Sequence, residues 1–596
     1  MFGTYERFDL VRASYARCAS NTVLFEAPER PGLLRLSNNW TGAAPNSTDF
    51  AFDVLLTVNG VPVKYTYFAD AGSLRLTAAC GAWAEVALTD RSLTRLRGKN
   101  AGLRLELRSA AGNGARACRG VFARPDGCGW EGEFGSFGKL FFRPLSGSVC
   151  VTAPFDWDKN EYSLLRVDLT PDAGTDGFDA AIHDYRDAIL PWGGYEPFDA
   201  LVENNRAEFE DFCKKYRAPA PGYEEMAKYA QWQIWSCKTK AIGTFKDSHI
   251  LFQNTWSCAA APWQQSYNAM AMLADPAEAW RLIRLMFLYQ EEATGRVPNM
   301  ITYSTFPMGG MQPAFQGFAL DYLIRKLGDG FISPEDAEDM LPKMAAWAEY
   351  WVKYRGTGRG DDTIALLSPH ESGWDDSSMF RDGFPTEEPN SMAFLVLLME
   401  AVALLARKCG REEEHDRWMA RSKRLTDVLV TEYWDGEKFA PRVRGKAVDS
   451  MSLACYQPII LGKRLPQEII DTVASKLTEE GQWLTEIGLA SENVHSPLAT
   501  YGVSFVCGRV VGPMNMILSV GLQAAGKQRE AELIARRYCD HTRREGVILG
   551  YAPYNVYKST GEKADQQIPP HPMDGWGWSS WSANCFLTMV TGVIGA

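Results

Sequence analysis

The first third of the chain alternates apolar and polar residues with a period of two. From about residue 20 to 170, short apolar runs such as FAFDVLLTVNG, VKYTYFADAG and YSLLRVDL are separated by Gly, Pro and Asn. Runs of this length and period, spaced by turn residues, are typical of half-buried antiparallel strands. The pattern therefore predicts an N-terminal antiparallel β-sandwich over residues 1–190.

The rhythm then changes to helical spacing. Pro191, Trp192, Gly193 and Gly194 open a predicted linker with a helical segment over 191–220. Beyond it, apolar residues recur at helical spacing. Twelve helices are expected, over 222–240, 263–275, 277–293, 312–327, 334–355, 388–409, 411–432, 447–461, 466–478, 513–525, 527–544 and 581–594.

These helices are expected to pair as hairpins with an inner and an outer member. NSMAFLVLLMEAVALLARKCG is apolar almost all round, whereas REEEHDRWMARSKRLTDVLV has a charged face. Long polar loops fall at every second connection, and six hairpins closed into an (α/α)6 toroid would gather those loops at one mouth. Hydrophobic periodicity alone is also compatible with an open helical solenoid, but no consensus repeat of about 34 or 40 residues is present. The predicted fold class is α+β and multidomain, with the toroid over 221–596.

Composition narrows the function classes. Net charge is −11 and no Lys/Arg run resembles a phosphate-tracking stripe, so nucleic acid is not an expected partner. The N-terminus lacks an apolar leader region and nowhere do 18 apolar residues run together, which predicts a cytoplasmic protein with no membrane partner. Thirteen Cys without CxxC pairs favour reduced thiols. A homo-oligomer is compatible with all of this.

Candidate chemistry lies in SPHESGWDDSSMFRDG, residues 368–383. This polar segment falls between two long predicted helices and would lie over the mouth of the toroid. A Trp beside carboxylates suits glycosidic bond hydrolysis, because the indole can stack on a sugar while an acid protonates the leaving oxygen. The alternative is an Asp-rich connection whose charges only face water. Similarly, the 19 Trp of the chain could face sugars or fill helix interfaces.

Four segments carry a family resemblance. ESGWDDSSMF resembles the ESGWDxS element of six-hairpin glycosidases of glycoside hydrolase families 63 and 37, which include mannosylglycerate hydrolase and trehalase. PWQQSYNAMAMLADPAEAW with YQEEATGRVPNMI, LASENVHSPLATYGVSFVCGRVVGPMNMIL, and YNVYKSTG with GWGWSSW resemble further family elements in the same order. The resemblance covers most of residues 220–596 and implies a glycoside hydrolase.

Site residues follow from that resemblance. Asp375 takes the general-acid position, and Glu371 and Asp376 are its expected like-charged neighbours, which would hold its proton near neutral pH. Arg509 would bind sugar hydroxyls or restrain an acid, with pairing to a helix carboxylate as the alternative. The substrate-binding set implied in this way is Trp263, Gln264, Gln312, Glu371, Trp374, Asp376, Arg509, Tyr554 and Trp578.

The sequence also departs from the family pattern. The position of the usual water-activating Glu is Ala552, Trp-Asp becomes Trp263-Gln264, and the Arg loop has Val506-Cys507 and Val511 in place of tryptophans. An alanine cannot accept a proton, so another group must do so. Glu492 is the first choice, and the alternatives, each of which could equally be a solvated loop residue, are Glu562, His571 and Asp574.

The expected function is an exo-acting, inverting glycoside hydrolase that removes an α-linked gluco- or manno-configured sugar from an oligosaccharide or small glycoside. A phosphorolytic six-hairpin enzyme is the runner-up, because phosphate attack needs no base, and a sugar-binding pseudoenzyme is the third reading. No cofactor and no catalytic metal are expected. The acidic run DGFPTEEP offers oxygen donors for a structural calcium ion, although most such loops are empty.

Overall fold

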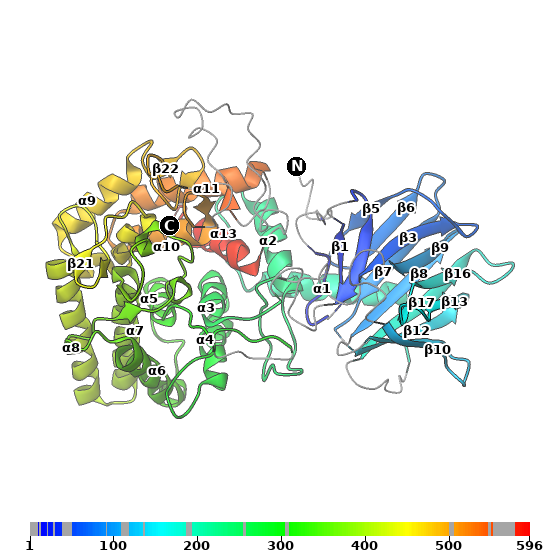
Figure 1. Cartoon of the computed structure of the whole chain (residues 1–596), viewed down its shortest axis with the longest axis horizontal. Coiled ribbons are helices and arrows are strands. Elements are labelled where there is room, and N and C mark those ends of the chain that lie inside the picture. Colours follow the sequence, from blue (N-terminus) through cyan, green and yellow to red (C-terminus); the bar gives the residue numbers. More distant parts are fainter. Residues whose placement is uncertain are drawn as a thin grey trace.

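The computed structural model places the two large β-sheets in the N-terminal part of the chain and the long helices, with a few short strands, in the C-terminal part (Figure 1). It describes residues 10, 14–20, 22–27, 30–38, 51–90, 92–108, 118–134, 138–185, 194–253, 258–303, 309–499, 506–545, 550–551 and 579–595.

Two antiparallel sheets form the N-terminal part. In spatial order the first contains β1 (Thr22–Glu26), β2 (Leu34–Asn38), β3 (Phe52–Val58), β9 (Gly102–Arg108), β16 (Leu164–Thr170) and β13 (Ser148–Thr152), with β4 (Val61–Pro62) paired to β3. The second contains β10 (Cys118–Ala123), β11 (Trp130–Phe134), β12 (Gly138–Ser146), β17 (Gly177–Tyr185), β8 (Leu93–Lys99), β7 (Trp83–Leu88), β6 (Leu74–Ala78) and β5 (Tyr65–Ala69).

The period-two pattern explains how the two sheets pack. Along β16, Leu165, Val167 and Leu169 are buried and alternate with more exposed neighbours. Phe52 of the first sheet contacts Phe134 and Phe142 of the second, with ring centroids 6.2 and 6.3 Å apart. The apolar faces of the two sheets therefore share one core.

Helix α1 (Phe198–Cys213) lies between the strands and the remaining helices (Figure 1). On one side, Arg206 forms an ion pair with Asp70 at 2.7 Å. On the other, Phe209 contacts Trp235 of α2, with ring centroids 5.5 Å apart. The predicted helical segment of the linker is thus present and packs against both parts.

Each of the twelve predicted helical segments contains a helix, with boundaries shifted by a few residues. They are α2 (Glu224–Ser236), α3 (Pro262–Ala271), α4 (Pro276–Arg284), α5 (Gln316–Leu327), α6 (Pro334–Arg355), α7 (Pro389–Lys408), α8 (Glu412–Val428), η8 (Leu453–Arg464), α9 (Gln467–Thr478), α10 (Gly512–Ala524), α11 (Gln528–Glu545) and α13 (Ser580–Gly592). Of these, η8 is 3₁₀ in character; it contains Pro458 and is interrupted by a kink at Gly462, whose backbone is non-helical.

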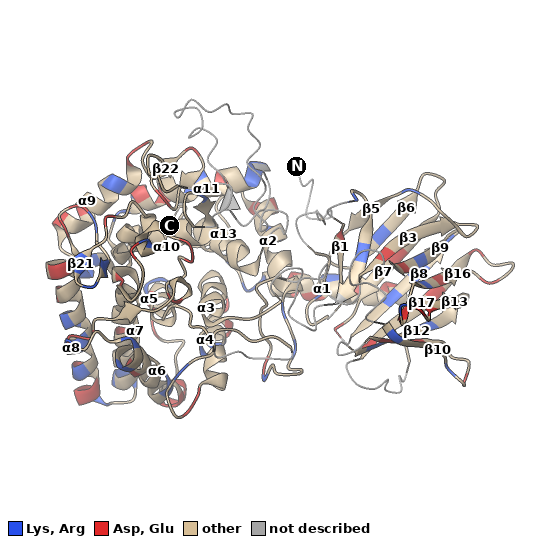
Figure 2. Cartoon of the chain, viewed as in Figure 1, with Lys and Arg blue, Asp and Glu red and all other residues tan. Residues whose placement is uncertain are grey.

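Six of these elements contact one another in a cycle. α3 packs against α5, α5 against α7, α7 against η8, η8 against α10, α10 against α13, and α13 against α3. α2, α4, α6, α8, α9 and α11 pack against members of this cycle. Figure 2 shows charged residues along α8 and few on α7, as expected for an outer and an inner helix.

α7 is apolar on nearly all sides because neighbouring helices surround it. Within the described residues it is the one helix long and apolar enough to cross a membrane, and 89% of its apolar window is buried inside the protein. Its composition therefore matches its place between α5, α6, α8 and η8. All thirteen cysteines fall in the described part, and each is a free thiol.

Candidate active site

The polar segment 368–383 forms a loop between two short strands. It runs from β18 (Ala365–Leu366) to β19 (Thr386–Glu387) and contains the 3₁₀ turns η5 (Pro369–Glu371) and η6 (Ser378–Phe380). The loop ends where α7 begins, at the cap residue Glu388. Acidic residues of the loop are therefore carried on short turns rather than on a helix.

Gly373 allows the backbone of this loop to approach α3 closely. Its φ is +75°, a left-handed conformation that favours glycine. A Cβ added there would lie 2.5 Å from the Cη2 atom of Trp263, so a larger residue would collide with the indole. The close approach of backbone to ring explains why the sequence has Gly directly before Trp374 and Asp375.

Asp375 is a half-exposed carboxylate of this loop. Its side chain is 47% exposed, and its Oδ1 atom lies 3.2 Å from Nδ1 of His370. Desolvation by the surrounding protein raises the pKa of Asp375, the charge and hydrogen bond of His370 lower it, and repulsion from Asp376 raises it. The net direction is upward, which favours the protonated form that a general acid needs.

Asp376 and Glu371 are engaged by other parts of the chain. Asp376 Oδ1 accepts a hydrogen bond of 2.7 Å from the backbone N–H of Val506. Glu371 is buried, and Arg355 donates to both of its oxygens at 3.0 Å from Nε. The Leu367 amide donates to it as well, at 2.9 Å.

Two expectations for Glu371 are therefore corrected. Its carboxylate is held in a buried ion pair with Arg355, so it is not placed to bind a sugar. It is also not among the charges that act on Asp375, where the like charge is Asp376. The physical reason is that Arg355, at the end of α6, neutralises Glu371 beneath the loop.

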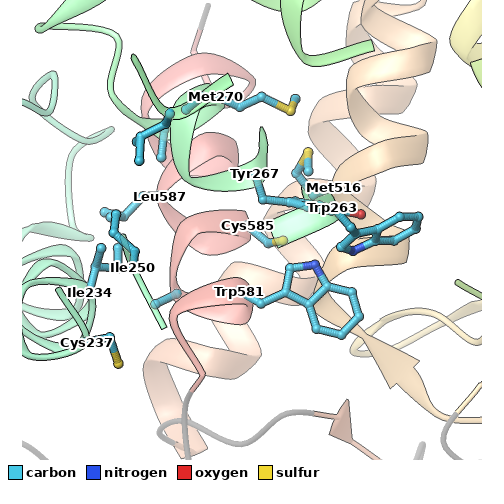
Figure 3. Close-up of a cluster of buried hydrophobic side chains, with 14 of the residues drawn as sticks. Ile234, Cys237, Ile250, Trp263, Tyr267, Met270, Met516, Trp581, Cys585 and Leu587 are labelled. Carbon is cyan, nitrogen blue, oxygen red and sulfur yellow. The ribbon is translucent and has the colours of Figure 1, made fainter. Parts of the chain in front are cut away.

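Trp374, Trp263 and Gln264 are core residues in this structure. Trp374 is fully buried and donates its indole N–H to Gln457 Oε1 at 2.9 Å. Trp263 is 4% exposed and lies in an apolar cluster with Tyr267 and Trp581 (Figure 3). Gln264 is 1% exposed and donates to Ser580 Oγ at 2.6 Å.

The expectation that these three side chains line an open sugar subsite is thus corrected. All three side chains are buried by helix packing, although Gln264 Oε1 has no hydrogen-bond partner within the described residues. Trp232, Trp235, Trp280, Trp347, Trp351 and Trp418 are likewise fully buried, so for these tryptophans the interface-filling alternative holds.

Glu492 lies beside the acid loop but is enclosed. It is fully buried, and its carboxylate accepts hydrogen bonds from Ser378 Oγ at 2.8 and 2.9 Å and from Ser496 Oγ at 2.8 Å. Burial raises its pKa, while the two serine hydroxyls lower it. Because Ser378 follows Asp375 by three residues, Glu492 holds one end of the loop that carries the acid.

Arg509 and Gln312 lie on two further loops. Arg509 is buried, and its carbonyl accepts a 2.9 Å hydrogen bond from the N–H of Ser491, the neighbour of Glu492. Gln312, before α5, is partly exposed and donates to Asn299 Oδ1 at 3.0 Å. The structure thus brings the Arg509 segment to Glu492, and the Val506 amide of the same segment to Asp376.

Several sequence candidates lie outside the described residues: Ala552, Tyr554, Glu562, His571, Asp574 and Trp578. Two described residues near the site, His370 and Ser378, were not among the sequence candidates. The histidine in SPHESGWDD was the signal for His370, whereas nothing in the serine spacing indicated Ser378.

Potential metal ligands do not cluster in the same residues. No three His, Cys, Asp or Glu side chains within the described part gather in a way that could hold a metal ion. In the acidic run 382–389, Glu387 accepts a hydrogen bond from the Tyr433 hydroxyl, and Glu388 accepts one of 2.7 Å from the Ser391 N–H. These two carboxylates are therefore used within the protein.

Comparison with solved structures shows proteins of similar fold. A bacterial glucoamylase complexed with acarbose is similar with a TM-score of 0.58 at 10% identity, over 97% of this chain and 94% of that one. A family 92 glycosyl hydrolase is similar with a TM-score of 0.52 at 12% identity, over 99% and 86%. The mannosylglycerate hydrolase from Thermus thermophilus, complexed with glucose, has a TM-score of 0.49 at 16% identity, over 61% and 99%.

The family is shown by the sequence itself. The model of the mannosylglycerate hydrolase MGH1-like glycoside hydrolase domain matches residues 253–566. Those residues are more than half of the chain, and the protein belongs to this family of glycoside hydrolases. No curated protein matches the sequence significantly.

Proposed function

We propose that the protein is an exo-acting, inverting glycoside hydrolase that removes an α-linked gluco- or manno-configured sugar from an oligosaccharide or small glycoside. The observation that carries the proposal is the setting of Asp375, a solvent-open carboxyl with a raised pKa on a loop otherwise held by ion pairs and hydrogen bonds. Membership of the MGH1-like glycoside hydrolase family supports the reaction class.

In the proposed reaction, the protonated carboxyl of Asp375 donates its proton to the glycosidic oxygen as the bond to C1 breaks. A water molecule attacks C1 from the opposite face, loses a proton to a base and leaves the sugar with inverted configuration. Asp376 acts by repulsion, which keeps the proton on Asp375 until transfer. His370 acts in the opposite sense, because it stabilises the aspartate left after transfer.

We further propose that the cycle of α3, α5, α7, η8, α10 and α13 is the inner ring of an (α/α)6 toroid. The outer helices α2, α4, α6, α8, α9 and α11 would complete six hairpins. On this proposal the catalytic domain spans 221–596, the β-sandwich domain spans 1–190, and the linker between them includes α1. The loops that carry Asp375, Gln312 and Arg509 each precede an inner helix, so the ring would collect them at one end.

This chain departs from its family at the residue that would act as the general base. That Glu492 activates water stays a prediction, and its surroundings favour the anchoring role because both oxygens already accept serine hydrogen bonds. An inverting base must lie across the sugar, about 6.5–9.5 Å from the acid. The other candidates are Glu562, His571 and Asp574.

Asp375→Asn and Glu492→Gln test the two assignments together. Loss of the general acid is expected to lower kcat by about 10²- to 10⁴-fold, measured on gluco- and manno-configured oligosaccharides and aryl glycosides. Glu492→Gln is expected to cost less than about tenfold, because an amide can still bond to the two serines, whereas loss of a base would cost as much as loss of the acid.

Three controls make this experiment decisive. Thermal unfolding must show that both variants are folded. Proton NMR of the first product anomer reports inversion or retention, and assays with and without inorganic phosphate separate hydrolysis from phosphorolysis. Wild-type turnover by Asp375→Asn would refute the acid assignment, and a wild-type protein silent on the whole panel would favour a sugar-binding pseudoenzyme.

A further inference from the structure

A small aromatic hairpin stands at one end of the β-sheet part. It consists of β14 (Phe155–Asp156) and β15 (Glu161–Tyr162), which pair only with each other and lie between β13 and β16 in the chain. The N–H of Ser163 donates to Pro154 O at 3.0 Å and closes the base of the hairpin. Because β13 is the edge strand of the first sheet, the hairpin extends the end of that edge ribbon.

The hairpin presents Trp157 to solvent. Among the large apolar side chains that the structure describes, Trp157 is the most exposed, at 85%. Its ring is braced edge-to-face by Phe155 at 4.8 Å between centroids, and Phe155 is braced in turn by Tyr162 at 5.1 Å. The fully buried tryptophans of the helical part fill helix interfaces, and this role cannot explain an exposed indole at position 157.

The turn that carries Trp157 is held by hydrogen bonds. Asp156 Oδ1 accepts from the N–H groups of Asp158 and Lys159, both at 3.1 Å, and Lys159 Nζ lies 3.3 Å from Asp156 Oδ2. Asn160 has a φ of 54°, a left-handed conformation that asparagine tolerates in turns. The turn that carries the indole is therefore ordered before a ligand binds, so stacking of a ligand on the indole costs little conformational entropy.

The surroundings of the ring indicate what kind of ligand fits. One indole face matches the apolar face of a pyranose ring, whereas a stable protein interface needs about 800 Å² on each partner. Asp158, Lys159 and Asn160 are exposed next to the indole. They offer hydrogen-bond acceptors and donors, which suit the hydroxyl groups of a sugar ring.

We propose that Trp157 is the stacking platform of a second carbohydrate site, on the β-sheet part, which binds a pyranose ring of a soluble polysaccharide. The site would hold the protein on a polysaccharide and would be separate from the loop that carries Asp375. It goes beyond the proposed catalytic function, since binding at Trp157 needs no proton transfer.

Affinity electrophoresis of the whole chain tests this site. The protein carries a net charge of −11 and migrates toward the anode in native gels at neutral pH, so retardation by soluble starch or yeast mannan cast into the gel reports binding. Wild-type protein is expected to be retarded by at least one of the two polymers. Trp157→Ala is expected to bind at least about tenfold more weakly.

Val61→Ala is the matched control, because Val61 is a 63% exposed apolar residue of β4, which pairs with β3 of the first sheet away from the hairpin. It should be retarded like wild type. Both variants should keep the wild-type melting temperature and the wild-type rate on a small aryl glycoside, which separates failure of this site from failure of the active site.

Three results would overturn the proposal. The first is equal retardation of Trp157→Ala and wild type in every gel. The second is a lack of retardation of the wild type in both polymers. The third is sedimentation showing that wild type self-associates while Trp157→Ala does not, which would make the hairpin a contact between copies of the chain.

Discussion

At the scale of single residues, the three carboxylates of ESGWDD lie in three different environments. Arg355 fixes Glu371, the Val506 amide fixes Asp376, and Asp375 keeps a solvent-open side chain beside His370. Glu371 is therefore structural, and Asp376, although exposed, is oriented by the Val506 amide, which leaves Asp375 as the acid available to move a proton. Their separation by environment rather than by residue type is the usual way in which neighbouring carboxyls acquire different roles.

His370→Ala is expected to move the pH dependence of hydrolysis. His370 lowers the pKa of Asp375, so its removal should raise that pKa further. A general acid works only while protonated, so activity falls as pH rises through its pKa. The alkaline limb of kcat/KM should therefore move to higher pH in the variant, with the maximal kcat little changed.

His370→Gln is the matched variant for this measurement. Glutamine keeps a neutral hydrogen-bond donor within reach but carries no charge, so a shift intermediate between wild type and His370→Ala would separate the hydrogen bond from the charge. An alkaline limb that moves to lower pH, or stays in place in both variants, would mean that His370 does not act on the catalytic acid.

At the scale of secondary-structure elements, the start of α7 links the acid loop to the helical core. Glu388 is fully buried at the N-cap of this helix and accepts the Ser391 N–H at 2.7 Å. A carboxylate suits a helix N-terminus, but the apolar surroundings disfavour its charge. Desolvation raises the pKa of Glu388 from 4.5 to about 7, although hydrogen bonds from Ser391 and Asn390 oppose the shift.

This shift predicts that Glu388→Gln changes how stability depends on pH. The folded-state pKa exceeds the unfolded value, so between about pH 4.5 and 7 the folded protein binds more protons and wild-type stability falls as pH rises. Glutamine does not titrate. Relative to wild type, Glu388→Gln should therefore gain up to about 3 kcal/mol between pH 5 and pH 8.

Chemical denaturation of both proteins across that pH range provides the measurement. The quantity of interest is the difference in free energy of unfolding between variant and wild type, which removes every other titrating group they share. A difference that stays constant from pH 5 to pH 8 would show that Glu388 is ionised throughout, and a difference that shrinks with pH would reverse the sign of its shift.

At the scale of the whole molecule, α1 ties the β-sheet part to the helical part. Asn205 is fully buried on this helix, and its amide donates to Leu88 O at 3.0 Å and Gly72 O at 3.2 Å. Its Oδ1 accepts a hydrogen bond from Arg17 Nε of the N-terminal segment. One side chain therefore joins three separate stretches of sequence.

Asn205→Ala is expected to lower the free energy of unfolding by about 2–4 kcal/mol, because it removes the partner of the Leu88 and Gly72 carbonyls and of the Arg17 Nε–H group. Asn204→Ala is the control, since Asn204 is exposed on the same helix and bonds only to Glu196 among its described contacts; it should cost less than about 0.5 kcal/mol. Urea unfolding measures both, and equal stability of the two variants would contradict the bridging role.

The sequence by itself determined the elements and the class of chemistry. Hydrophobic periodicity is a local property, so strands such as β3, β5 and β16 and all twelve helical segments could be located, and α7 could be told from α8 by its uncharged faces. The order of ESGWDD and three further motifs was enough to indicate a glycoside hydrolase, as the family match confirms.

Only the tertiary structure decided which side chains are free to act. Trp374, Trp263 and Gln264 stand at motif positions, yet packing of α3 against α13 and of the acid loop against η8 buries them. Glu371 and Asp375 are four residues apart and chemically alike, but Arg355 reaches one and solvent the other. Burial and pairing depend on residues far away in the chain, and a local pattern carries no information about such contacts.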